Sequence, residues 1–178
     1  MLFRSNPVPA PVLGATHLCS GTNIMLSDTS MGGAWSTSDA TVAIIGTDGT
    51  LYGLVAGNVI ATYSVGSCVA VKNITVNQTP DAISGARTIC ISTGLILTDT
   101  YSGGIWTTQN SSIAVVDSMG FVTGTGGGTV VITYTMDGSC IATTTVTVNT
   151  SPTPIIGIPS VCQGLTTRLT NADVSGTW

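Results

Sequence analysis

The chain has 178 residues and few charged side chains, four Lys or Arg and eight Asp, which give a net charge of −4. It therefore lacks the basic patch from which nucleic-acid binding draws most of its affinity. The mean hydropathy is +0.48, yet no apolar run in the sequence approaches the ~20 residues that a membrane-spanning helix requires.

The composition favours β-structure. Thr, Val and Ile supply 31, 18 and 16 residues, whereas Glu is absent and Lys occurs once. Side chains branched at Cβ fit pleated strands, and most good helix formers are missing. The composition therefore predicts an all-β protein.

A module of 71 to 72 residues is repeated along the chain. A cysteine and a tryptophan mark each copy most clearly: Cys19, Cys90 and Cys162, and Trp35, Trp106 and Trp178. Glycine, leucine and tyrosine positions keep the same interval. Coincidences this numerous at one offset indicate a tandem repeat.

Proline-bearing stretches at 6–9, 77–80 and 149–154 separate the copies. Proline stiffens a connector and removes a hydrogen-bond donor, so these stretches are predicted to be linkers. We therefore expect the end of a preceding linker at 1–8, one repeat at 9–79, a second at 80–150 and an incomplete third at 151–178. On this interpretation the chain stops inside a domain, as part of a longer array or as a subunit completed by another chain.

Within each repeat, short alternating segments predict strands. Residues 59–65 and 130–136 alternate between an apolar face and a face that carries most of the Thr or Ser, and 140–148 repeats the pattern. Asp48-Gly49 and Met119-Gly120 supply turns between earlier strands. About seven strands in some 70 residues are typical of an immunoglobulin-like β-sandwich, so we predict tandem domains of this fold.

The order of cysteines and tryptophans supports the same fold. A tryptophan lies between two cysteines in each complete repeat, which predicts Cys19–Cys68 and Cys90–Cys140 disulfides, each worth about 4 kcal/mol on the chain-entropy estimate. A Cys68–Cys90 bond between repeats is the alternative. Cys162 is then unpaired or intermolecular, and Trp35, Trp106 and Trp178 are expected in the cores.

The second copy contains a sequence motif made of several segments. It comprises a Trp with a polar turn and a Val-rich strand at 106–116, a Gly-Phe-Val-Thr-Gly hairpin at 120–124, and a strand ending in Ile-Thr-Tyr at 128–134. The first copy follows a similar pattern at 35–45 and 49–63. These segments resemble the bacterial Ig-like domain of group 2, many members of which lack the cysteines. The resemblance implies a spacer, stalk or adhesive module with no catalytic residues to carry over.

The sequence offers little for catalysis or metal binding. His17 is the only histidine and has no counterpart in the other copies, so no hydrolase triad and no zinc site is expected. We predict no catalytic residues, metal or cofactor. Asp28 and Asp99 are interpreted as Asx turns, with calcium at the linkers as the rarer alternative.

Several residues match glycosylation motifs. Four asparagines lie in Asn-x-Ser/Thr triplets and one serine follows an aspartate: Asn73, Asn77, Asn110, Asn149 and Ser118. These motifs are compatible with a secreted protein.

The sequence thus predicts a non-enzymatic, extracellular or cell-surface bacterial repeat protein that forms a fibre, filament or adhesin stalk. Its expected partners are further repeats or other copies of itself end to end, through strand complementation if another chain completes the third repeat. Glycans are further candidate partners; nucleic acid is not, and no membrane span is expected in this segment. The alternative is a carbohydrate- or receptor-binding module, for which the variable stretches 27–32 and 98–103, where Tyr101 replaces Ser30, are the best candidate surface.

Overall fold

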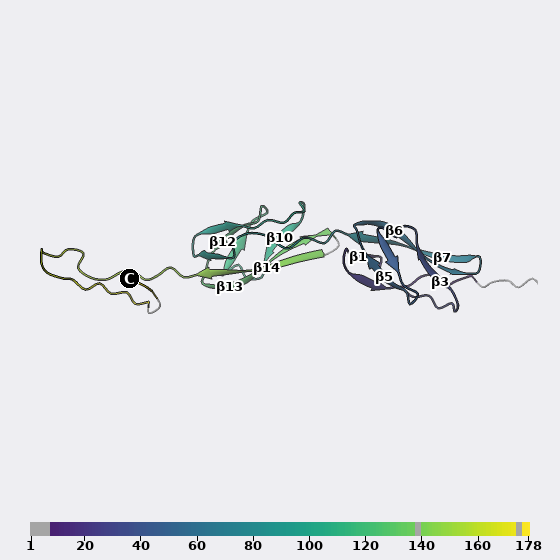
Figure 1. Ribbon diagram of the computed structural model, residues 1–178, viewed down its shortest axis with the longest axis horizontal. Helices are drawn as coiled ribbons and strands as arrows, with labels where there is room; N and C mark the ends of the chain where they lie inside the picture. The colour runs from purple at the N-terminus through teal and green to yellow at the C-terminus, as the bar shows by residue number, and fades with distance from the viewer. Residues whose placement is uncertain (1–7, 138–139, 174–175) are drawn as a thin grey trace, which may run out of the picture.

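The computed structural model describes residues 8–137, 140–173 and 176–178, so residues 1–7 of the expected leading linker lie outside the described residues. Three parts follow one another end to end in an elongated chain (Figure 1). We call them unit 1 (residues 9–79), unit 2 (80–150) and the terminal segment (151–178).

Each unit contains two sheets in which most neighbouring strands are antiparallel. In unit 1 one sheet has the order β1-β7-β6-β3 and the other β2-β5-β4. Its strands are β1 (His17–Cys19), β2 (Asn23–Met25), β3 (Ala34–Thr37), β4 (Ala43–Ile45), β5 (Thr50–Gly53), β6 (Gly57–Val65) and β7 (Cys68–Asn77).

Unit 2 repeats this topology, with sheet orders β10-β13-β14-β8 and β11-β12-β9. Its strands are β8 (Thr88–Cys90), β9 (Gly94–Ile96), β10 (Ile105–Thr108), β11 (Ala114–Val116), β12 (Phe121–Gly124), β13 (Gly128–Met136) and β14 (Cys140–Asn149). The prediction of an all-β chain of tandem immunoglobulin-like sandwiches is confirmed.

The alternation read from the sequence explains the packing. In β13, Val130, Ile132 and Tyr134 are buried, whereas the residues between them lie on the opposite face. The buried residues of unit 1, from Val12 to Val76, form one cluster, and those of unit 2 form another. Each unit therefore has its own core.

A tyrosine closes one end of each core. The Tyr63 hydroxyl donates to the Ser30 carbonyl at 2.7 Å and accepts from the Gly33 N–H at 2.9 Å. Its ring packs tilted against half-buried Trp35, with centroids 4.7 Å apart. Unit 2 repeats this arrangement with Tyr134, Tyr101, Gly104 and Trp106. Trp35 and Trp106 therefore line the cores, as expected.

The predicted turn glycines serve two purposes. Gly49 and Gly120 have φ of +87° and +80°, which a residue without Cβ adopts freely. A Cβ would also lie 2.2 Å from the Leu26 carbonyl oxygen at Gly49, and 2.3 Å from that of Leu97 at Gly120. Glycine is therefore required both for the turn and for the close approach of two chain segments.

In the terminal segment the expectation of a core tryptophan is wrong. Trp178 is 79% exposed. The described residues of this segment form only an isolated bridge between Ile156 and Thr170, and no described strand places a tyrosine against Trp178. Without that partner its ring remains on the surface.

Candidate functional site at the junction between the units

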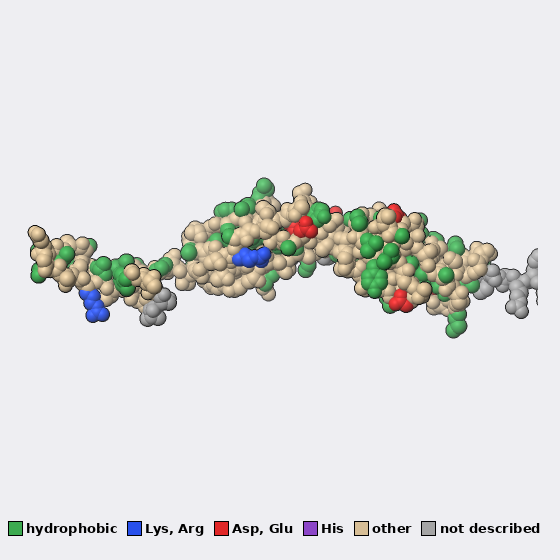
Figure 2. Space-filling view, in the orientation of Figure 1, with side chains coloured by type: hydrophobic (Ala, Val, Ile, Leu, Met, Phe, Trp, Pro, Cys, Tyr) green, Lys and Arg blue, Asp and Glu red, His purple; other side chains and the backbone are tan. Residues whose placement is uncertain are grey.

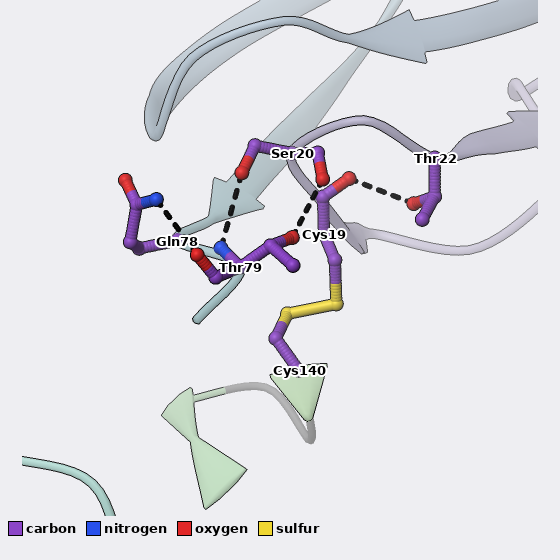
Figure 3. Close-up of a disulfide and its surroundings, with 6 residues drawn as sticks. All are labelled: Cys19, Ser20, Thr22, Gln78, Thr79 and Cys140. Carbon is purple, nitrogen blue, oxygen red and sulfur yellow. Dashed lines mark hydrogen bonds between the residues drawn. A yellow bond between two sulfur atoms is a disulfide. The ribbon is translucent and has the colours of Figure 1, made fainter. Parts of the chain in front are cut away.

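A disulfide joins the two units. Cys19 at the end of β1 bonds Cys140 at the start of β14, with the two Cα atoms 5.7 Å apart (Figure 3). Cys140 is buried and lies at the tip of the β13–β14 hairpin, which reaches back from unit 2 to unit 1 (Figure 1). The bond spans 121 residues of sequence and closes both units into one covalent loop.

The predicted pairings within units are wrong, and the strand register gives the reason. In unit 1, Cys19 is paired with Asn77 at one end of β7, whereas Cys68 is at the other end. Nine steps along a strand cover about 30 Å, and a disulfide requires Cα atoms within about 7 Å. Cys90 and Cys140 are separated in the same way along β14, because Cys90 is paired with Asn149.

The alternative Cys68–Cys90 bond is wrong as well. Cys68 lies at the β6–β7 hairpin tip, away from unit 2, and Cys90 lies at the end of unit 2 that faces the terminal segment (Figure 1). The bond does join neighbouring units, as that alternative anticipated, but it uses the other cysteine of each unit.

Hydrogen bonds support the junction on the unit 1 side (Figure 3). The Ser20 N–H donates to the Asn77 carbonyl at 2.8 Å. Thr79 in the linker donates its N–H to Ser20 Oγ at 3.0 Å and its hydroxyl to the Ser20 carbonyl at 2.6 Å. The linker is thereby fixed to the residue next to Cys19, so the disulfide and the linker hold the units at two adjacent points.

The remaining cysteines lie at equivalent places in the repeat. Cys90 is the counterpart of Cys19 and is an exposed free thiol, as is Cys162 in the terminal segment. Cys68 is the counterpart of Cys140 and is half-buried at its own hairpin tip. Each unit thus carries one cysteine at each end.

A sequence signal for this arrangement exists. Cys68 and Cys140 each follow a Gly-Ser pair directly after a long alternating strand, which is the position of a hairpin tip. Cys19 and Cys90 each precede the next turn. Cysteines at opposite ends of a sandwich cannot meet inside it, whereas those of consecutive sandwiches can.

Other candidate residues form no further site. His17 is exposed, with the Thr16 hydroxyl 3.4 Å from its Nδ1. Within the described ranges, no group of three His, Cys, Asp or Glu side chains is placed to hold a metal ion. The part of the chain that the structure describes also contains no helix with the length and apolar character to cross a membrane.

The aspartates form local turns. The Asp28 carboxylate accepts from the Ser30 N–H at 2.7 Å and that of Asp99 from the Tyr101 N–H at 2.9 Å, which confirms the predicted Asx turns. The Thr41 hydroxyl, followed by its N–H, lowers the pKa of Asp39.

Asp48 behaves similarly. The Thr50 N–H, followed by its hydroxyl, lowers the pKa of Asp48. Both carboxylates are fixed by hydrogen bonds of 2.6 to 3.0 Å at turns of unit 1.

Four of the five predicted glycosylation positions are exposed, namely Asn73, Asn110, Asn149 and Ser118, and Asn77 is half-buried. The Asn110 side chain accepts from the Ser112 N–H at 3.0 Å, and the Asn77 carbonyl accepts from Ser20 at the junction. Glycan attachment at these positions stays a prediction.

No protein-family model matches the sequence, and no curated protein matches it either. Among solved structures, the C-terminal 282-residue fragment of intimin, in complex with the intimin-binding domain of its translocated receptor, is similar with a TM-score of 0.56 and 17% identity. That match covers 85% of this chain and 67% of the fragment.

Invasin, a bacterial integrin-binding protein, is similar with a TM-score of 0.53 and 16% identity over 92% of this chain. This chain spans 46% of the invasin structure. At such low identity both likenesses bear on the fold alone, and they agree with tandem immunoglobulin-like sandwiches.

Proposed function

We propose that this chain is a non-catalytic, extracellular structural repeat protein that forms part of a surface stalk or fibre. The observation that carries the proposal is the Cys19–Cys140 disulfide between consecutive sandwiches. A globular domain is stabilised by bonds inside its own core, whereas a bond between successive domains fixes their relative position. A stalk or fibre requires successive domains to be held in a fixed relative position, so this kind of bond suits it.

The position of the bond has a mechanical consequence. A force applied along the chain passes from Cys19 through the sulfur atoms to Cys140, so the residues between them lie outside the load path. Most strands of both units, from β2 to β13, belong to this protected loop. Pulling can then extend only the residues before Cys19 and after Cys140. The cores of both sandwiches therefore stay folded while the chain is under tension.

The surface supports the same role. Few charged side chains are seen on the face shown in Figure 2. Thr143, Thr145 and Thr147 lie on the outward side of β14. Disulfides persist in oxidising compartments outside the cytosol. The fold shared with intimin, which binds a translocated receptor, and with invasin, a bacterial integrin-binding protein, supports a location at the cell surface.

Single-molecule force spectroscopy tests the proposal. The oxidised chain, held at its two ends, is expected to release roughly 400 Å less contour length than the reduced chain, because 121 residues at about 3.4 Å each remain closed. Cys19→Ala is the matched variant and should extend fully without reductant. Equal extension of the oxidised and reduced chains would contradict a load-bearing disulfide, and immunogold labelling of intact cells tests the location.

Receptor or carbohydrate binding is a second candidate. Intimin and invasin are described with a receptor domain and as an integrin-binding protein, respectively. In this chain Tyr101 is 37% exposed at a turn of unit 2 where unit 1 has Ser30. Glycan-array binding that disappears in Tyr101→Ala and survives in Tyr52→Ala would favour this candidate.

A further inference from the structure

The terminal segment has the local conformation of the beginning of a complete unit. The Ile156–Thr170 bridge, with both backbone hydrogen bonds at 2.8 Å, is the counterpart of Leu13–Ser27 in unit 1 and Ser84–Thr98 in unit 2. Gly157 has a positive φ, like Gly14 and Gly85 at the same position. The backbone of this part of the repeat is therefore already formed.

Its core positions are open. Ile155 is 61% exposed, whereas its counterparts Val12 and Ile83 are 5% and 3% exposed. Leu169 is 43% exposed, whereas Leu26 and Leu97 are 1% exposed. Figure 2 shows hydrophobic side chains on the surface of this segment. In the complete units the covering residues belong to the later strands, β4–β7 and β11–β14.

A cavity lies where the complete units hold their tyrosine. It has a volume of about 460 Å³, and its lining includes Ile155, Asp173, Gly176 and Trp178. A Cβ built at Gly33 or Gly104 would lie 2.3 or 2.5 Å from the ring of Tyr63 or Tyr134, whereas nothing lies within 4 Å of one built at Gly176. Asp173 and Trp178 correspond to Tyr101 and Trp106, which contact Tyr134 in unit 2.

Cys90 lies at the end of unit 2 that faces this segment, in the position from which Cys19 bonds the next unit. In unit 2 the same hairpin that inserts Tyr134 into its core also presents Cys140 to Cys19. The cavity and the thiol are two separate observations, and a single hairpin of this type would satisfy both.

We propose that the terminal segment and Cys90 together are the acceptor for the later strands of a further repeat of this kind, whose tyrosine fills the cavity and whose hairpin-tip cysteine bonds Cys90. The inference rests on the proposed structural role and adds the partner's chemistry: an apolar alternating hairpin with Tyr followed by Cys five or six residues later, as in Tyr63–Cys68 and Tyr134–Cys140. Each added repeat would then be bonded to the one before it.

The bond forms by thiol–disulfide exchange. The Cys90 thiolate attacks the partner cysteine's sulfur in a mixed disulfide with a small thiol such as glutathione. The new S–S bond forms as the old one breaks, and glutathione leaves as the thiolate. No net oxidation is needed at this step, because the mixed disulfide already carries the oxidising equivalent.

The test adds a peptide of residues 107–149, carrying glutathione on Cys140, to the full chain. Mass spectrometry of a non-reduced digest is expected to find the peptide's Cys140 on Cys90. A Tyr134→Ala peptide should lower the yield at least about tenfold, because it leaves the cavity unfilled. A bond to Cys162, or equal yields from both peptides, would overturn the proposal.

A second experiment tests the same proposal without a separate peptide, so it does not depend on the peptide's solubility. The chain is extended after Trp178 by its own residues 107–149, in the register of the repeat. The appended counterpart of Cys140 should protect Cys90 from alkylation. A Cys90 that remains alkylatable, or a Cys90–Cys68 bond between two copies of the unextended chain, would overturn the assigned partner. The Cys19–Cys140 force measurement is independent of all these outcomes.

Discussion

Unit 1 and unit 2 have nearly the same fold but end differently. At both ends the first strand turns in the same way: the Thr22 N–H donates to the Cys19 carbonyl and the Thr93 N–H to the Cys90 carbonyl, each at 3.1 Å. Yet Cys19 is bonded to the next unit, whereas Cys90 is a free thiol. The turn therefore forms without the disulfide, and Cys19 is bonded where the tip of the β13–β14 hairpin reaches it.

The side chain after the cysteine differs as well. Ser20 accepts a hydrogen bond from the linker residue Thr79, whereas its counterpart Ile91 packs against the core of unit 2. The backbone bond that precedes the linker is kept, from Ser20 to Asn77 and from Ile91 to Asn149. The first junction thus has a side-chain contact that the end of unit 2 lacks, in addition to its covalent bond.

Removing the disulfide, which only the first junction has within the described residues, is expected to lower the free energy of unfolding more than any other change considered below. On the chain-entropy estimate a loop of 121 residues contributes up to about 5 kcal/mol to the free energy of unfolding. Replacing both Cys19 and Cys140 by Ala should lower the guanidinium midpoint accordingly. Hydrogen exchange should show faster opening at the junction than in the sheet centres.

Cys90→Ala is the matched control, because Cys90 occupies the same position in unit 2 but forms no bond within the described residues. We expect its denaturation midpoint to equal that of the unmodified chain. Equal loss in both variants would mean that the cysteine side chain, and not the cross-link, stabilises the junction.

The fold could be predicted from the sequence because its causes are local. Alternation in 130–136, glycines at 49 and 120, and the repeat interval act within a strand or a turn, and all three agree.

The disulfide pairing could not be predicted in the same way. It depends on which end of a sandwich each cysteine occupies and on how consecutive units meet. The spacing of Cys, Trp and Cys is compatible with the familiar bond inside one domain, whereas the registers of Cys19 against Asn77 and of Cys90 against Asn149 exclude it. Trp178 shows the same limit, because the repeat places it like Trp35 and Trp106, yet no strand of the described residues covers it.

Removing the tyrosine hydroxyl separates its hydrogen bonds from the packing of its ring, which the terminal segment also lacks within the described residues. Tyr134→Phe leaves the Gly104 N–H and the Tyr101 carbonyl without this partner, which typically costs about 1–3 kcal/mol. Urea denaturation should show this loss. Tyr52→Phe, at an exposed position, is the control and should leave the midpoint unchanged.

A smaller effect is expected from the linker contact. Ser20→Ala removes the acceptor of the Thr79 N–H, at a cost of about 0.5–1.5 kcal/mol, but keeps the bond from the Thr79 hydroxyl to the backbone. Exchange of the Thr79 amide hydrogen should accelerate. In the reverse experiment, Ile91→Ser with Ser151→Thr should slow exchange at residue 151 if the contact is transferable, and unchanged exchange there would show that it is not.

The smallest expected effect concerns pH and tests how equivalent the two units are apart from their ends. Thr41 lowers the pKa of Asp39 below 3.8 in the folded state. The ionised Asp39 carboxylate therefore contributes to the free energy of unfolding above pH 3.8, and this contribution is lost as the pH falls through the lowered pKa. Unit 2 has Asn110 at this position, whose side chain makes the same turn without titrating. Asp39→Asn should therefore reduce the difference between the urea midpoints of unit 1 measured at pH 7 and at about pH 2.5. If the difference persists in full, the acid sensitivity of unit 1 arises elsewhere, with the similarly lowered Asp48 as the next position to replace.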